Sequence, residues 1–401
     1  MSFRYIAGIL GTAPTVVGPV DGEGGTAPGI WTRPDQARFQ ALGTWPKPII
    51  DKYLWSWGYN QSGQLGLGNI TSYSSPKQVG ALATWLAITA GYNCTLTTQT
   101  DKALWTWGIN DQGQLGLGNT ANRSSPNQVG ALTTWSQVTG GRLHTVATKT
   151  DGTLWTWGRN NVGQLGLGNT IYRSSPNQVG ALTTWLNIAG GNGFTVATKT
   201  NGTLWTWGKN DVGQLGLGNI TYYSSPKQVG ALTTWSSVAA GYSHIVATKT
   251  DGTLWAWGYN ASGQLGLGNT ADRSSPVQVG ALTTWLNISG GQYYTAANKT
   301  DGTLWAWGSN SNGQLGLGNT TNYSSPKQVG ALTTWLAISA GYTHTAANKT
   351  DGTLWSWGVN NFGQLGLGNI TNYSSPKQVG ALTTWLSVSA GNNHTIGRTS
   401  S

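Results

Sequence analysis

The chain has 401 residues, of which 38% are hydrophobic and 8% charged, and its formal net charge is +10. This low charge, together with 23 Trp residues, is unlike the composition of a disordered chain, so we expect a packed core. The single cysteine, Cys94, excludes a disulfide within the chain. A basic balance permits anionic partners, but the chain has no run of Lys and Arg, so nucleic acid is not an expected partner.

The first expected domain, residues 1–50, is a mostly irregular N-terminal extension without repeats. Its first ten residues have one basic residue and a broken apolar run, which fits neither a membrane span nor a signal peptide. A Gly/Pro-rich loop over 18–29 precedes an expected short helix, capped by Thr32 or Arg33 and ending before Gly43. Three aromatic residues would then need a surface to pack against: Trp31, Phe39 and Trp45. We therefore expect an assembly segment here.

The second expected domain, residues 51–401, consists of seven copies of one unit with a period of fifty residues. Its most regular stretch is LWSWGYNQSGQLGLGN at 54–69, which returns six times without insertion or deletion. A fixed period of this length predicts a solenoid, propeller or array, in which equal units bury their faces against neighbours.

Each repeat contains four short strand signals and no helical period. In one unit these signals lie at 185–189, 194–198, 203–207 and 225–229. Asn201-Gly202, replaced by Asp-Gly in most other copies, predicts a hairpin with a type I′ turn between the second and third strands. Short, evenly spaced strands in such repeats predict an all-β fold, a seven-bladed β-propeller of four-stranded antiparallel blades.

The phase of the repeat predicts how the propeller closes. The repeat region begins at a third strand and ends after a second strand, so one blade must be composite. Residues around 385–398 would be completed by residues around 53–79. Trp55 and Trp57 are two positions apart and leave the same strand face, opposite the small Ser56, as stacked blades require.

The W-G-x-N-x-x-G-Q-L-G-L-G core, preceded by G-x-x-H as at 141–144, resembles the RCC1 repeat (regulator of chromosome condensation) over about 51–401. The resemblance implies a seven-bladed propeller closed by shared terminal strands. It does not imply one activity, since members include a nucleotide-exchange factor for a small GTPase, chromatin binders and a protein inhibitor of β-lactamases. Exchange factors of the family carry a wedge-like insertion in one blade, and chromatin binding uses a basic tail. Here every repeat has fifty residues, and the first fifty residues hold only Arg4, Arg33 and Arg38 before Lys47.

The stretch from Gly25 to Pro46 is similar to short segments in structural proteins of marine bacteriophages. It has a Gly-rich start, then Gly-Ile-Trp-Thr, and a Gln-containing helix signal that ends in Gly-Thr-Trp-Pro. This resemblance implies a virion component, such as a tail fibre or decoration protein. Near-identical tandem repeats of low charge suit such an appendage. If the chain is not phage-encoded, the sequence leaves its compartment open.

No residue set in the sequence predicts catalysis, a metal site or a cofactor. The four histidines occupy one repeat position in separate blades: His144, His244, His344 and His394. Stacked sheets lie about 10 Å apart, too far for a shared zinc ion, so packing at strand ends explains these residues better. The Gly-rich loops lack the following helix and the Lys-Ser/Thr of a phosphate loop. The aspartates mostly occupy hairpin turns, and no Ser-His-Asp set stands out from its repeats, so we expect no enzyme.

The copies differ mainly at 59, 61–62, 71–73, 92–94 and the equivalent positions. In a four-stranded meander, the first-to-second and third-to-fourth connections emerge on one face, which would therefore be individualised. Surfaces rich in Tyr and Arg favour recognition, although neutral variation of exposed loops would give the same pattern. The predicted binding residues on this face are Tyr59, Tyr92, Arg123, Arg142, Arg159, Arg173, Phe194, Lys209, Tyr242, Tyr259, Arg273, Tyr293 and Phe362.

The sequence thus predicts a non-enzymatic structural and recognition protein of a phage virion. Its N-terminal segment would dock onto other virion proteins or onto further copies of the chain, as a homo-oligomer. Its variable loop face would contact a host glycan or protein, without insertion into a membrane. The alternative is a stand-alone protein-binding propeller, including a guanine-nucleotide exchange factor for a small GTPase.

Overall fold

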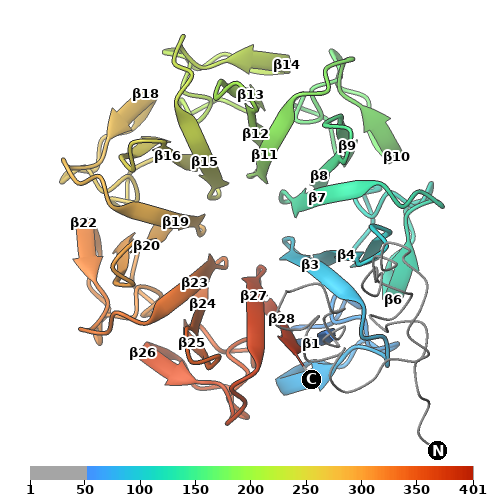
Figure 1. Cartoon of the computed structure of the whole chain (residues 1–401), viewed down its shortest axis with the longest axis vertical. Coiled ribbons are helices and arrows are strands. Elements are labelled where there is room, and N and C mark those ends of the chain that lie inside the picture. Colours follow the sequence, from blue (N-terminus) through green and yellow to red (C-terminus); the bar gives the residue numbers. More distant parts are fainter. Residues whose placement is uncertain (1–51, 401) are drawn as a thin grey trace, which may run out of the picture. The chain divides into compact units, whose positions relative to one another are not determined.

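The structure is a computed structural model, and it describes residues 52–400. These residues form seven four-stranded antiparallel sheets arranged as blades around a centre, and no helix lies among them (Figure 1). The predicted all-β, seven-bladed propeller is therefore confirmed. The expected helix after Thr32 and the segment containing Trp31, Phe39 and Trp45 lie outside the described residues.

Within each blade the four strands follow one another from the centre to the rim. The innermost strands are β3 (Trp85–Ala90), β7 (Trp135–Gly140), β11 (Trp185–Gly190), β15 (Trp235–Ala240), β19 (Trp285–Gly290), β23 (Trp335–Ala340) and β27 (Trp385–Ala390). The second strands are β4 (Cys94–Gln99), β8 (His144–Lys149), β12 (Phe194–Lys199), β16 (His244–Lys249), β20 (Tyr294–Lys299), β24 (His344–Lys349) and β28 (His394–Ser400).

The third strands carry the paired tryptophans, and the fourth strands form the rim. The third strands are β1 (Lys52–Gly58), β5 (Leu104–Gly108), β9 (Leu154–Gly158), β13 (Leu204–Gly208), β17 (Leu254–Gly258), β21 (Leu304–Gly308) and β25 (Leu354–Gly358). The fourth strands are β2 (Tyr73–Gln78), β6 (Arg123–Gln128), β10 (Arg173–Gln178), β14 (Tyr223–Gln228), β18 (Arg273–Gln278), β22 (Tyr323–Gln328) and β26 (Tyr373–Gln378). Each fourth strand contains a proline, such as Pro76, at the edge of the sheet where a missing N–H is tolerated.

The composite blade has the strand order β2-β1-β28-β27, so both ends of the repeat region share one sheet. Lys52 pairs with Ser400 and the register continues to Gly58 opposite His394. This confirms the predicted closure. In this blade β28 is paired on both sides, because β1 covers the edge that β28 would otherwise expose.

The hairpin between the second and third strands is present, but the predicted type I′ turn is wrong. Gly202 has φ +74°, whereas Asn201 does not adopt a positive φ as a type I′ turn requires. Gly202 N donates to Lys199 O at 2.9 Å and Lys199 N donates to Thr203 O at 3.0 Å. This pattern is a type I turn followed by a glycine bulge. A Cβ on Gly202 would lie 2.1 Å from Thr233 O, so the close approach of the linker to the next blade also requires glycine.

The Gly-Gln-Leu-Gly loop joins neighbouring blades. Gln64 O accepts hydrogen bonds from Trp107 Nε1 (3.0 Å) and from Thr95 Oγ1 (2.8 Å), both in the next blade. Asn60 Oδ1 holds the loop from within by accepting from Leu65 N at 2.9 Å. Gly66 lies against the same indole, since a Cβ there would be 2.6 Å from Trp107 Nε1. Packing between blades therefore explains why the sequence of this loop is the same in every copy.

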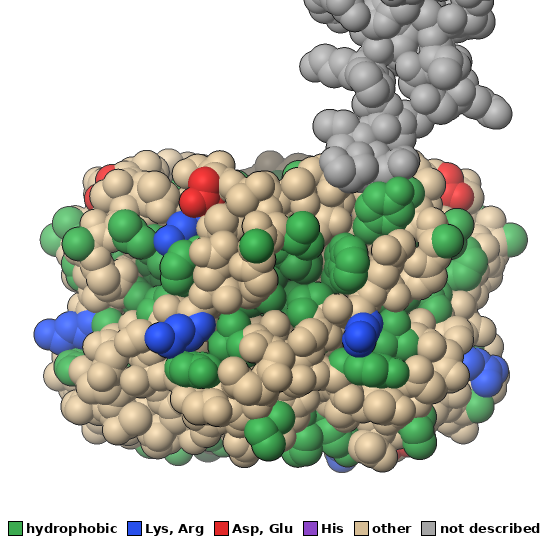
Figure 2. All heavy atoms as spheres, turned by 90° about the horizontal axis from the view of Figure 1, so that it is seen from below, with side chains coloured by type: hydrophobic (Ala, Val, Ile, Leu, Met, Phe, Trp, Pro, Cys, Tyr) green, Lys and Arg blue, Asp and Glu red, His purple; other side chains and the backbone are tan. Residues whose placement is uncertain are grey.

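The two tryptophans of each third strand differ in burial. Trp57 is completely buried and Trp55 only half-buried. Within one blade, Trp107 of β5 meets Trp85 of β3 edge-to-face with ring centroids 6.0 Å apart, an arrangement that aromatic pairs favour. On the rim seen in Figure 2, Lys and Arg side chains are spaced singly and form no continuous stripe.

Candidate functional site

The variable connections lie together at one end of every blade. Tyr59 N donates to Asn393 O at 2.8 Å, and Ile109 N donates to Asn93 O at 2.9 Å. These bonds join the third-to-fourth connection to the first-to-second connection, as the sequence predicts. We call this side of the propeller the loop face. At the other end, Thr100 N donates to Thr84 O at 2.9 Å, which joins the hairpin turn to the linker between blades.

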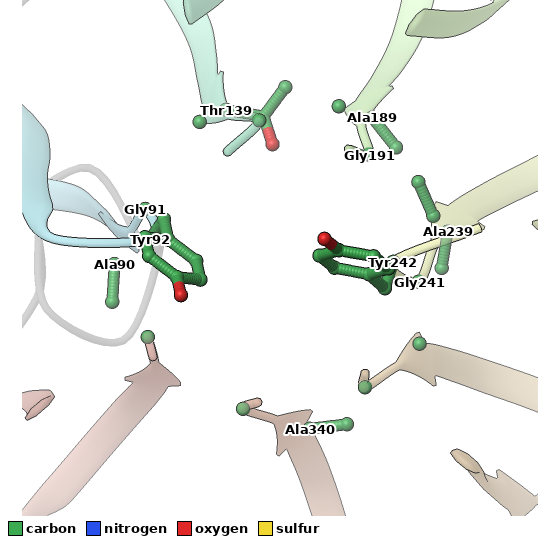
Figure 3. A pocket seen from close by; sticks show the side chains of 18 of the residues that line it. Ala90, Gly91, Tyr92, Thr139, Ala189, Gly191, Ala239, Gly241, Tyr242 and Ala340 are labelled. Atoms are coloured by element: carbon green, nitrogen blue, oxygen red, sulfur yellow. The ribbon is translucent and has the colours of Figure 1, made fainter. Parts of the chain in front are cut away.

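A cavity of about 310 Å³ opens at the centre of the loop face. All seven innermost strands line it with small residues such as Thr139, Ala189 and Ala340 (Figure 3). Tyr92 and Tyr242 project into it from facing sides. Small side chains on the walls and large polar aromatic side chains at the opening give a concave surface that can hold a side chain of another molecule.

Arg142 connects these two tyrosines. Its Nη1 atom donates to Tyr242 Oη at 3.0 Å. Its guanidinium carbon lies 5.1 Å from the ring centroid of Tyr92 and 5.7 Å from that of Tyr242, within the range of cation–π attraction. Arg142 is therefore held in place by two residues from other blades before any partner binds.

Three further tyrosines extend this group. Tyr342 lies edge-to-face with Tyr92 (5.5 Å between centroids) and with Tyr242 (5.9 Å). Tyr293 contacts Tyr242 at 5.7 Å, and Tyr259 contacts Tyr293 at 5.6 Å. We call these six residues the mouth cluster: Tyr92, Arg142, Tyr242, Tyr259, Tyr293 and Tyr342.

The mouth cluster is half-buried, and this raises the pKa of two of its tyrosines. Burial, reinforced by the neighbouring Tyr92 and Tyr242, raises the pKa of Tyr342 well above its ordinary value. Burial and Tyr242 also raise the pKa of Tyr293. The raised pKa keeps the phenols of Tyr293 and Tyr342 protonated, so that both can act as hydrogen-bond donors.

Tyr342 is missing from the residues predicted from the sequence. It occupies the repeat position of Tyr92, Arg142 and Tyr242 in the copy that begins at Leu304, so the period itself was the signal that pointed to it.

The structure separates the other predicted residues into groups. Arg159 and Lys209 line a second cavity of about 200 Å³ beside the mouth, and Arg142 lines both cavities. Tyr59 and Phe362 contact each other with ring centroids 4.8 Å apart. Three arginines stand apart from these groups because they begin rim strands: Arg123, Arg173 and Arg273.

Phe194 is the one predicted binding residue that the structure contradicts. Its side chain is completely buried and packs in a cluster with Val196 and Trp257. Every residue of its strand is buried, and its cluster includes Trp235 and Trp257 of the neighbouring blade. It cannot contact a partner on the loop face.

The histidines equivalent to Phe194 are also buried, which confirms their predicted packing at strand ends. His144 Nε2 lies 3.0 Å from Thr195 Oγ1 of the next blade, and His344 Nε2 lies 2.8 Å from Thr395 Oγ1. A Cβ on Gly141 would lie 2.2 Å from His144 Cε1, which explains the G-x-x-H spacing. Within residues 52–400, no three His, Cys, Asp or Glu side chains come together as metal ligands would. Nor does that range contain a helix that could cross a membrane.

Known protein families match this chain over the repeat region. The sequence profile of the RCC1-like domain matches residues 50–291. That match spans more than half of the chain. The chain belongs to the RCC1-like domain family. Profiles of the regulator of chromosome condensation (RCC1) repeat extend the match through 301–347 and 351–397, and a second profile of this repeat matches 286–314 and 335–364.

Solved structures agree on the fold of this RCC1-like propeller. Human WBSCR16 is 22% identical, with a TM-score of 0.79, over 87% of this chain and 99% of that one. Prp20p from Saccharomyces cerevisiae is 20% identical, with a TM-score of 0.80, over 88% and 92%. Yeast RCC1 (Prp20) bound to Kap60 is 19% identical, with a TM-score of 0.78, over 88% and 89%. At these identities the likeness shows the fold alone. Comparison with curated protein sequences gives no significant match.

Proposed function

We propose that this RCC1-like propeller is a non-enzymatic protein-binding module that recognises its partner through the mouth cluster on the loop face. The observation that carries the proposal is the convergence of Tyr92, Arg142, Tyr242 and Tyr342 from four blades around one cavity. Tyr and Arg, together with Trp, are enriched among the few residues that carry most of the binding energy at protein interfaces. Contacts among them fix their rotamers in advance, which lowers the entropy cost of binding.

The contrast between the two faces supports this proposal. The hairpin turns of the opposite face repeat Thr-Asp-Gly-Thr with few changes, whereas the residues equivalent to Tyr92 include Tyr, Arg, Asn and Gln. Prp20p, which shares the fold, is described with its binding to Gsp1p and histones. A propeller of this architecture that binds proteins is thus a precedent for the proposal.

The observations favour general protein binding over nucleotide exchange. Every repeat has fifty residues, so no blade carries a longer loop that could act as a wedge. The virion interpretation depends on residues 25–46, outside the described range, and stays a prediction. Acceleration of nucleotide release from a small GTPase would favour the exchange-factor alternative.

The test compares partner capture by three immobilised forms of the full chain. Wild type is compared with the double variant Tyr92→Asn and Tyr242→Asn, since Asn192 and Asn392 already occupy the equivalent positions. Asp301→Asn on the opposite face is the matched control, because Asn201 stands at that position in another copy. We expect proteins quantified by mass spectrometry to be retained by wild type and the control but lost from the double variant. Equal retention by all three forms would refute the proposal.

A further inference from the structure

The second cavity on the loop face concentrates positive charge. Its lining contains Arg142, Arg159 and Lys209 and no acidic residue. Among the residues equivalent to Tyr59 and Tyr92 in all seven repeats, these three are the only cations, and no acid occurs there. All three therefore converge on one cavity between two adjacent blades, those of β9 and β13. Nothing in the packing of the propeller requires this, because the equivalent positions elsewhere hold Tyr, Asn, Gln, Ile, Ser or Val.

Two of the cationic side chains at this cavity are held by a polar neighbour. Arg159 Nε donates to Asn161 Oδ1 at 2.8 Å, which leaves both of its Nη groups without a protein partner among residues 52–400. Lys209 Nζ lies 2.8 Å from Asp211 Oδ2. That pair is partly exposed, so it contributes little to stability and can exchange its partner. The cavity keeps a net positive charge with all three cations and Asp211 counted.

We propose that this cavity binds a carboxylate side chain of an acidic segment in the protein partner. The inference rests on the proposed function, since it names the chemistry of the partner that the loop face recognises. The planar fork of Arg159 suits a carboxylate, and Lys209, which lines the same cavity, adds a point charge. Because Arg142 lines both cavities, the residue next to the carboxylate in the bound segment would lie over the mouth cluster.

Carboxylates fit the site better than a nucleic-acid backbone. A phosphate backbone needs a row of cations along its path. At the positions equivalent to Tyr59 and Tyr92 the cations are confined to one sector, because the copies from Leu254 onward carry none there. Acidic residues on the outer loops, such as Asp111 and Asp272, would also repel a long polyanion.

The test measures binding of a fluorescein-labelled hexaglutamate peptide to the full chain by fluorescence polarisation, with a hexaglutamine peptide for comparison. The double variant Arg159→Ser and Lys209→Ser removes two cations at positions where Ser309 stands in another copy. The matched control, Lys327→Asn and Lys377→Asn, makes the same change in net charge on the rim, where Asn127 and Asn177 are equivalent.

We expect the hexaglutamate affinity to fall about tenfold or more in the double variant and to change less than about twofold in the control. An equal loss in both variants would mean attraction to the net charge alone, and it would overturn the inference. So would a hexaglutamine peptide that binds as well as hexaglutamate. Tenfold tighter binding of a phosphoserine peptide of the same length would overturn the choice of carboxylate. Partner capture that depends on Tyr92 and Tyr242 but not on Arg159 and Lys209 would refute this inference and leave the proposed function standing.

Discussion

Trp57 Nε1 donates a hydrogen bond of 3.0 Å to Gln364 O, although 307 positions separate the two residues in the sequence. The equivalent bond from Trp207 to Gln164 spans only 43 positions. The contact that closes the ring is therefore the same contact that joins neighbouring repeats within it. Because every blade is held on both sides, no blade acts as an open end of the array.

This relationship predicts equal effects of removing the indole donor at the closing and the interior positions. Trp57→Phe and Trp207→Phe should each lower the free energy of unfolding by at least about 1 kcal/mol, the net value of one hydrogen bond, with lost packing added. Urea denaturation followed by circular dichroism measures both. Destabilisation by Trp207→Phe alone would show that the closing contact of Trp57 does not stabilise the ring as the interior contact does.

The buried histidines predict loss of stability in mild acid. Burial lowers the pKa of His144, His244 and His394 to about 4, whereas the ordinary value is 6.5. Between these values the unfolded chain binds protons that the folded chain does not. Stability should therefore be complete above pH 6.5 and fall toward pH 4, by about 1.4 kcal/mol per pH unit for each histidine. Urea midpoints measured across this range test the prediction.

Replacing two histidines separates their effect on stability from that of other groups that titrate in the same pH range. His144→Phe and His244→Phe introduce the residue that Phe194 already places, completely buried, at the same position. We expect the double variant to lose about half of the stability change between pH 6.5 and 4, because two of four histidines remain. A pH dependence equal to that of the wild type would contradict the assignment.

A lysine on the second strand lies against the half-buried tryptophan of the third strand and the buried tryptophan of the innermost strand. Lys299 Nζ lies 3.7 Å from the ring centroid of Trp305 and 5.0 Å from that of Trp285. Lys299→Gln should lower the free energy of unfolding by about 0.5–2 kcal/mol, the range of a cation–π contact. The reciprocal change, Gln99→Lys, should be stabilising, because Gln99 occupies the same position beside Trp85 and Trp105. Denaturation midpoints that move in neither variant would exclude the contribution.

Cys94 should be chemically silent in the folded protein. Its side chain is 2% exposed, and burial raises the pKa of its thiol to about 12. Because the thiolate is the reactive form, iodoacetamide at pH 8 should leave native protein unlabelled and label it rapidly in urea. Intact-mass spectrometry distinguishes the two. Fast labelling without denaturant would indicate that the first full blade opens locally.

Much of the candidate site could be predicted, because the repeat aligns seven versions of each position. Variation at the positions of Tyr59 and Tyr92 marked the loop face, and the meander rule placed both connections on the same side. The failure at Phe194 has a local cause. Variation continues one residue into the strand, where the side chain turns from the surface into the gap between blades. Sequence variation alone does not distinguish exposed positions from buried ones that accept His, Phe, Tyr or Cys.

The sequence by itself determined the number of blades, the strand order and the composite closure, because these follow from a fixed period and its phase. Only the tertiary structure decided which variable residues meet. Tyr92, Arg142, Tyr242 and Tyr342 come from four blades and contact one another because the innermost strands converge on a common centre. Arg159 and Lys209 share a cavity because adjacent blades bring them together, whereas Arg123, Arg173 and Arg273 start rim strands and stay apart. The distance of a residue from the centre of the propeller decides which residues of other blades it contacts. The order of residues along the chain does not give this distance.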